Sequence, residues 1–248
     1  MKNRFLPLLL IVGLMTVAAC TKENDNSSIY GNELTRGYYP LTKGHYVLYD
    51  VDSTIWNDFA GDSTKRHMQV RYDIADSFRN NQNTISYQIE VRTRATDSSA
   101  FVSNDVFYAT PVENGLDITQ NNLRFRKLVF PVKNGTSWEG NSQIATADQD
   151  LQYYADWFYT YYDQGQSFNT GKANFDNTIT VQEVNDSLNS PELMPGVYAE
   201  RTYAKEVYSY NVGLIYREIT RWVYDQNPSS GKYARKGYSV VMRAVDHN

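Results

Sequence analysis

Two neighbouring stretches alternate between apolar and polar residues, and this alternation constrains the fold more than any other feature of the chain. A period of two is the pattern of a β-strand that buries one face. The stretches span residues 67–74 and 84–94, and the turn-forming run at 80–83 lies between them. They therefore predict a β-hairpin. The apolar positions are Met68, Val70, Tyr72, Ile74, Ile85, Tyr87, Ile89 and Val91.

Similar patterns predict strands along most of the remaining chain. Segment 197–210 is ambiguous, because Ala199, Tyr203 and Val207 fall at helical spacing whereas Tyr and Val favour strands. Strands separated by short turns favour an antiparallel all-β architecture with at most one or two short helices. No fixed repeat or Pro-rich linker divides residues 36–248, so we expect one domain there. The further predicted strands are 45–55, 105–110, 115–119, 123–130, 152–163, 174–184, 213–223 and 238–245.

The start of the chain has the pattern of a bacterial export signal. Lys2 and Arg4 precede an apolar stretch at 5–17, which is shorter than the roughly 20 residues of a membrane-spanning helix. The small residues before Cys20 then resemble the lipobox of bacterial lipoproteins. That resemblance implies a signal peptide at 1–19, cleavage before Cys20, and palmitate-type lipid on the Cys20 thiol and amino group. We expect residues 20–35 to be a flexible polar tether.

Lipidation would anchor the protein to a membrane and would use the only cysteine in the chain. No thiol would remain for disulfides, zinc sites or nucleophilic catalysis. The sequence Lys22-Glu23, followed by Asp25, resembles the surface-export signal of Bacteroidota lipoproteins. We therefore expect attachment to the outer membrane, with either the periplasmic or the surface side left open.

Charge and motif content exclude several functions. The chain has 24 Lys and Arg against 28 Asp and Glu, without a basic stripe, so nucleic acid is not an expected partner. His45, His67 and His247 lack metal-type spacing, and no nucleophile elbow or phosphate loop is present. We expect no metal, no cofactor apart from the covalent lipid, and no catalytic residues.

Three motifs resemble a group of uncharacterised Bacteroidota lipoproteins. They are Y-Y-P-L-T-K-G-H-Y at 38–46, F-P-V-K-N-G-T-S-W at 130–138, and N-V-G-L-I-Y-R-E at 211–218. Their Pro, Gly and apolar residues suggest structural roles. The resemblance implies a β-rich domain of the open or half-barrel type, with a β-sandwich as the alternative, and it implies no known activity.

One segment, 153–162, is unusually aromatic. If the segment is a strand, one of its faces carries Tyr153, Trp157, Tyr159 and Tyr161. These four are our candidate ligand-binding residues. Such a face could stack sugar rings or line an apolar pocket. The alternative is a central strand that is covered on both sides.

Three functions remain open at this stage. We favour a non-enzymatic envelope lipoprotein that binds a glycan, an apolar ligand or an envelope protein. A structural or assembly accessory of an outer-membrane complex comes second. A glycan hydrolase comes third, because a pair of carboxylates can come from anywhere in the chain.

Overall fold

The computed structural model describes residues 37–248. The predicted signal peptide at 1–19, the lipid attachment site Cys20 and the tether at 20–35 lie outside the described residues.

The described residues form one antiparallel sheet and a single short 3₁₀ helix, η1 (Gln152–Tyr154). Strand order is β6-β5-β4-β3-β2-β1-β12-β11-β10-β9-β8-β7, so β1 pairs with β12 in the middle of the sheet. The strands are β1 (Tyr46–Asn57), β2 (Asp62–Arg79), β3 (Ile85–Arg94), β4 (Val102–Val112), β5 (Gly115–Gln120), β6 (Leu123–Val129), β7 (Ser137–Glu139), β8 (Phe158–Asn169), β9 (Asn174–Leu188), β10 (Ala199–Ser209), β11 (Gly213–Gln226) and β12 (Tyr233–His247).

The sheet curls into a nearly closed barrel. Its two edges, β6 and β7, approach each other, and the backbone N–H of Arg126 donates to the carbonyl of Gly140 at 2.8 Å. The indole Nε1 of Trp138 on β7 donates to the carbonyl of Arg126 at 2.7 Å. The all-β antiparallel prediction is confirmed, and a single curled sheet agrees with a barrel rather than a sandwich.

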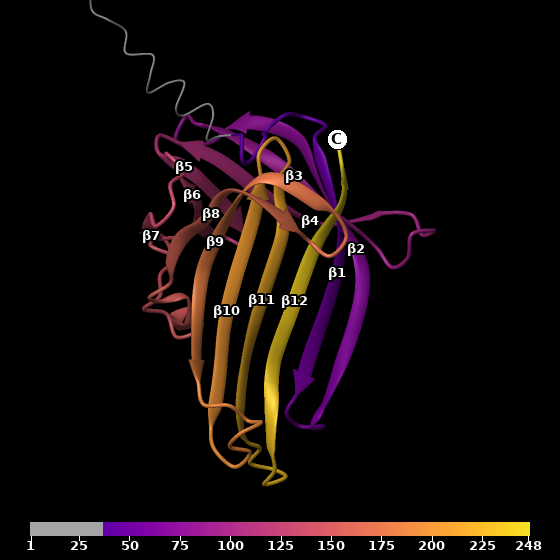
Figure 1. Ribbon diagram of the computed structural model, residues 1–248, viewed down its shortest axis with the longest axis vertical. Coiled ribbons are helices and arrows are strands. Elements are labelled where there is room, and N and C mark those ends of the chain that lie inside the picture. The colour runs from indigo at the N-terminus through magenta and orange to yellow at the C-terminus, as the bar shows by residue number, and fades with distance from the viewer. Residues whose placement is uncertain (1–36) are drawn as a thin grey trace, which may run out of the picture.

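Strands differ greatly in length, and this difference gives the barrel two unlike ends (Figure 1). β9, β11 and β12 have 14 or 15 residues, whereas β5 and β6 have six and seven. The long strands extend to the lower end of the molecule in Figure 1, while the shorter ones gather around the upper part. At the lower end the β1–β2 and β11–β12 hairpins meet, as the Asn227 side chain donates to the carbonyl of Asp58 at 2.9 Å.

The apolar core fills the upper part of the barrel. Its largest fully buried side chains are tyrosines, and each places its ring in the core while its hydroxyl finds a polar partner. The Tyr49 hydroxyl, for example, donates to the carbonyl of Leu214 at 2.8 Å. These tyrosines are Tyr49, Tyr159, Tyr161 and Tyr208.

Two segments differ from the simplest interpretation of the sequence. The ambiguous segment 197–210 is strand β10, which pairs with β9 and β11 on either side. The predicted strand at 152–163 is wrong in its first half, where η1 and a turn precede β8. Asp156 adopts a positive φ of 60°, and this backbone conformation interrupts an extended chain.

Gly237 on β12 gives a test of this sheet. It lies opposite Trp56 and Trp222, has a φ of +145°, and an added Cβ would meet the backbone of Arg221. We expect Gly237→Ala to lower the free energy of unfolding by about 2–4 kcal/mol, measured by urea denaturation.

Gly61 is the matched control, because its φ is +69° but an added Cβ meets nothing within 4 Å. Gly61→Ala should cost about 1–2 kcal/mol. Equal losses in the two variants would contradict the packing argument at Gly237.

Candidate binding cleft

The aromatic segment divides between the core and a cleft. Tyr159 and Tyr161 on β8 are fully buried, with 0% exposure. Their hydroxyls donate to Asn141 Oδ1 and to the carbonyl of Val129, both at 3.0 Å. The expected ligand-binding role of Tyr159 and Tyr161 does not fit this burial, since neither side chain reaches a surface.

Tyr153 and Trp157 lie before β8 and line a cleft. Trp157 Nε1 donates to the carbonyl of Tyr153 at 2.9 Å, which fixes the indole against the η1 turn. Its ring meets that of Tyr154 edge-on, with 5.5 Å between centroids. The outer face of β8 is exposed instead, with Phe158 at 57% and Tyr162 at 49%.

The outer part of the cleft, which we call the vestibule, lies between the η1 turn and the lower halves of β9, β10 and β11. Its volume is about 620 Å³, which is large enough for several sugar rings. One wall comes from the segment around η1 and consists of Gln152, Tyr153, Ala155, Asp156, Trp157 and Phe158. The wall from β9–β11 is mainly polar and includes Asn185, Asp186, Glu200, Thr202 and Arg221, with Val184, Trp222 and Val223 beside them.

A smaller cavity of about 50 Å³, the inner chamber, continues from the vestibule into the barrel. The two cavities share Tyr153, Trp157, Glu183, Thr202 and Arg221 in their linings. The inner chamber also reaches Lys127, Arg217 and several tyrosines. It therefore joins an aromatic wall to a group of charged residues.

A buried ionic cluster of Lys127, Glu183, Glu206 and Arg217 lies beside the inner chamber. Lys127 Nζ on β6 donates to Glu183 on β9 and, at 3.0 Å, to Glu206 Oε1 on β10. Arg217 Nε on β11 lies 3.2 Å from the same Glu206 oxygen, and the Tyr208 hydroxyl donates to the other. The cluster thus ties one edge of the sheet to strands near the opposite edge.

The motifs and composition of the sequence did not point to these four residues. A signal was present, because charged residues occupy the apolar phase of alternating strands: Arg217 falls in phase with Ile215 and Ile219. Which charges meet depends on strand register across the barrel, and that register is not encoded locally.

Burial and neighbouring charges shift the pKa values of the two carboxyl groups, Glu183 and Glu206, in opposite directions. Burial and then the repulsion of Glu206 raise the pKa of Glu183 to about 7. Burial alone would also raise the pKa of Glu206, but Lys127, Arg217 and the Tyr208 hydroxyl together hold it well below its usual value.

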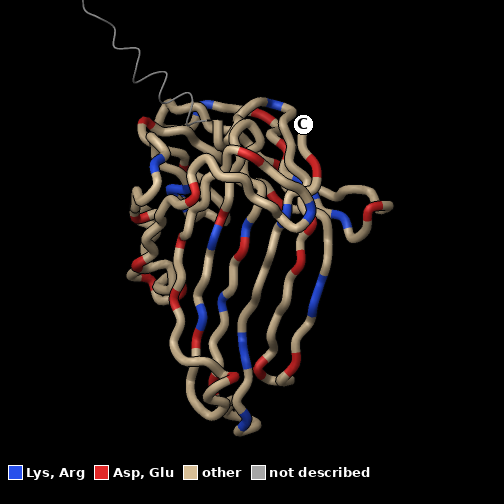
Figure 2. The backbone as a smooth tube through the Cα atoms, viewed as in Figure 1, with Lys and Arg blue, Asp and Glu red and all other residues tan. Residues whose placement is uncertain are grey.

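Arg221 is the other notable cation of the cleft. Its guanidinium carbon lies 3.5 Å from the centroid of the Tyr153 ring, a cation–π contact. Within residues 37–248 its side chain makes no ion pair or hydrogen bond. Elsewhere, acidic and basic residues are interspersed along the strands (Figure 2).

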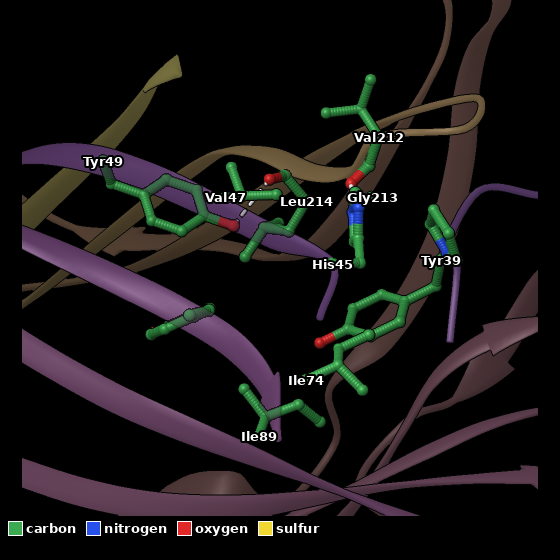
Figure 3. Close-up of a pocket in the computed structure, with 11 residues that line it drawn as sticks. Tyr39, His45, Val47, Tyr49, Ile74, Ile89, Val212, Gly213 and Leu214 are labelled. Carbon is green, nitrogen blue, oxygen red and sulfur yellow. Dashed lines mark hydrogen bonds between the residues drawn. The ribbon is translucent and has the colours of Figure 1, made fainter. Parts of the chain in front are cut away.

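A second cavity at the upper end is too small to hold a ligand. It measures about 20 Å³ and lies under Tyr39 (Figure 3). His45 reaches toward the carbonyl of Val212 with 2.9 Å between His45 Nε2 and that oxygen, and Tyr49 bonds Leu214 nearby. This space holds about one water molecule, so we assign it to packing.

Comparison with known proteins leaves the family open. No protein-family profile matches the chain, and no curated protein matches it. A crystal structure of a Bacteroides fragilis protein with a YmcC-like fold aligns with a TM-score of 0.40 and 11% identity, covering 85% of this chain and 98% of that one. This similarity is too low to inform the site.

Within residues 37–248, no group of three or more His, Cys, Asp or Glu residues could hold a metal ion, and no helix is long and apolar enough to cross a membrane.

The raised pKa of Glu183 predicts how stability depends on pH. A carboxyl with a higher pKa in the folded state stabilises the fold when protonated, and this contribution is lost as pH rises from about 4.5 to about 7. We expect the melting temperature to fall between pH 5 and pH 8, and Glu183→Gln to reduce that fall. Circular dichroism melts would measure it, and parallel curves for the two proteins would contradict the assignment.

Proposed function

We propose that this chain is a non-enzymatic, lipid-anchored envelope protein that binds a glycan in the cleft between η1 and β9–β11. The observation that supports this function is a large open vestibule with aromatic residues on one wall and polar side chains on the other. Sugar rings stack their C–H faces on aromatic rings, while their hydroxyl groups donate to carboxylate and amide oxygens.

The polar wall favours a glycan over an apolar ligand. Asp186, Glu200 and Asn185 would lose hydration on contact with an apolar surface and would gain no partner. Burying such groups without a hydrogen bond costs about 1–3 kcal/mol each. A hydroxyl-rich ligand supplies the missing donors, so the wall binds it without this penalty.

A hydrolase is the second candidate, because Glu183 and Glu206 differ in pKa. A glycosidase likewise uses one carboxyl group with a raised pKa as its acid and a second that stays ionised. Their geometry argues against it. Both carboxylates bind the same lysine, Lys127, which occupies the position where a glycosidic bond would have to lie. Glu206 is also only 2% exposed and does not line the cleft.

Tyr153 allows a direct test of glycan binding. Its side chain is partly exposed and lines the cleft wall, with its ring between the Tyr154 ring and the Arg221 guanidinium, so Tyr153→Ala should leave the fold intact. Loss of this ring from the wall is worth about 1–1.5 kcal/mol, so we expect affinity for oligosaccharides to fall about tenfold. Isothermal titration calorimetry with array-selected oligosaccharides would measure this change.

Tyr162→Ala is the matched control, because Tyr162 is an exposed tyrosine on the outer face of β8. It should bind oligosaccharides like the unaltered protein. If no oligosaccharide binds, or if both variants lose affinity equally, the cleft is not the glycan site. Release of shortened products during incubation would instead support the hydrolase.

The anchor is tested at Cys20. Cys20→Ser removes the thiol that would carry the diacylglycerol, so we expect the protein to leave the membrane fraction and to lose palmitate labelling. Labelling of cells with palmitate and detergent phase partition would show both effects. A variant that still partitions with the membrane would contradict lipid anchoring.

A further inference from the structure

The charges along the cleft change sign from its mouth to its inner end. The vestibule is acidic, since Asp156, Glu183, Asp186 and Glu200 face a single cation, Arg221. The inner chamber is basic, because three cations line it together with Glu183 alone: Lys127, Arg217 and Arg221. A ligand in this cleft therefore experiences an increasingly positive surface as it enters.

The charges of the ionic cluster compensate one another, but Arg221 has no counter-ion. Lys127 and Arg217 are paired with Glu183 and Glu206. Arg221 is held only by the face of Tyr153, with its guanidinium 3.5 Å from the ring centroid. Its five N–H donors are therefore available to a ligand.

Arg217 adds positive charge deeper in the chamber. Its side chain is 23% exposed, and its ion pair to Glu206 runs through Nε. Arg217 and Arg221 lie on the same face of β11, about 13 Å apart along the strand. Guanidinium groups bind planar oxyanions such as carboxylates through paired hydrogen bonds.

We propose that the glycan ends in an acidic sugar, whose carboxylate enters the inner chamber, binds Arg221 and is attracted by the charge of Arg217. The following sugars then lie in the vestibule against the wall formed by the η1 turn and the exposed Phe158, with their hydroxyls donating to Asp186 and Glu200. This inference rests on the proposed glycan-binding function and adds the class of sugar and its direction of entry.

The test uses oligosaccharides in matched pairs, each as a hexuronic acid form and as the neutral hexose form, presented to the protein on an array. Selected pairs are then titrated by calorimetry. We expect the acidic member to bind at least about tenfold more tightly, the gain of one charge-assisted contact. Arg221→Gln should reduce that preference to less than about threefold.

Arg71→Gln is the matched control. Arg71 on β2 also stacks on a tyrosine, with its guanidinium 3.9 Å from the Tyr46 ring centroid, but it lines neither cavity of the cleft. It removes the same charge and should keep the full preference for the acidic member. Equal loss in both variants would mean that net charge, and not the inner chamber, determines the preference, and would overturn the proposal.

The outcomes separate this inference from the proposed function. Equal or tighter binding of neutral members, abolished by Tyr153→Ala, would overturn the acidic-sugar assignment and leave the glycan cleft in place. A preference for acidic members that persists in Arg221→Gln would also overturn it. Binding of no oligosaccharide of either kind would overturn both proposals.

Discussion

The closure of the barrel depends on one buried contact, the lysine of β6 held between two glutamates of β9 and β10. Lys127 lies on one edge of the sheet, whereas Glu183 and Glu206 lie on strands near the other edge. A buried ion pair gains little over apolar packing, but removal of one partner costs about 3–5 kcal/mol because a charge is left uncompensated. The cluster therefore favours one way of bringing the two edges of the sheet together. The short β7 completes the closure through the bond from Trp138 to Arg126 on β6.

The same cluster separates two different interiors. Above it the barrel is filled with aromatic side chains whose hydroxyls are satisfied, as in Tyr49 and Tyr161. Below it the long strands have no equally long partners across the barrel, so apolar packing ends and a hollow remains. The cleft follows from the unequal lengths of the strands.

Local pattern predicted most of the strands, because alternation reports which face of a strand is buried. It failed where the decisive information was not local. Tyr153, Tyr159 and Tyr161 are all tyrosines within one short segment. Only the turn at Asp156 places the first in the cleft and the other two in the core. The ionic cluster joins Lys127 to Glu206, 79 residues apart, through a register that only the closed sheet defines.

The chain enters the described fold at the upper end, where Gly37 bonds Asn211 in the turn that precedes β11. The cleft lies near the other end of that strand, at Arg221–Val223, roughly 30 Å away. The long sheet thus acts as a rigid spacer between the entry point and the cleft mouth. A long polymer that is too bulky to reach the end where the chain enters can still place its own end in the cleft. The rest of the polymer then remains outside.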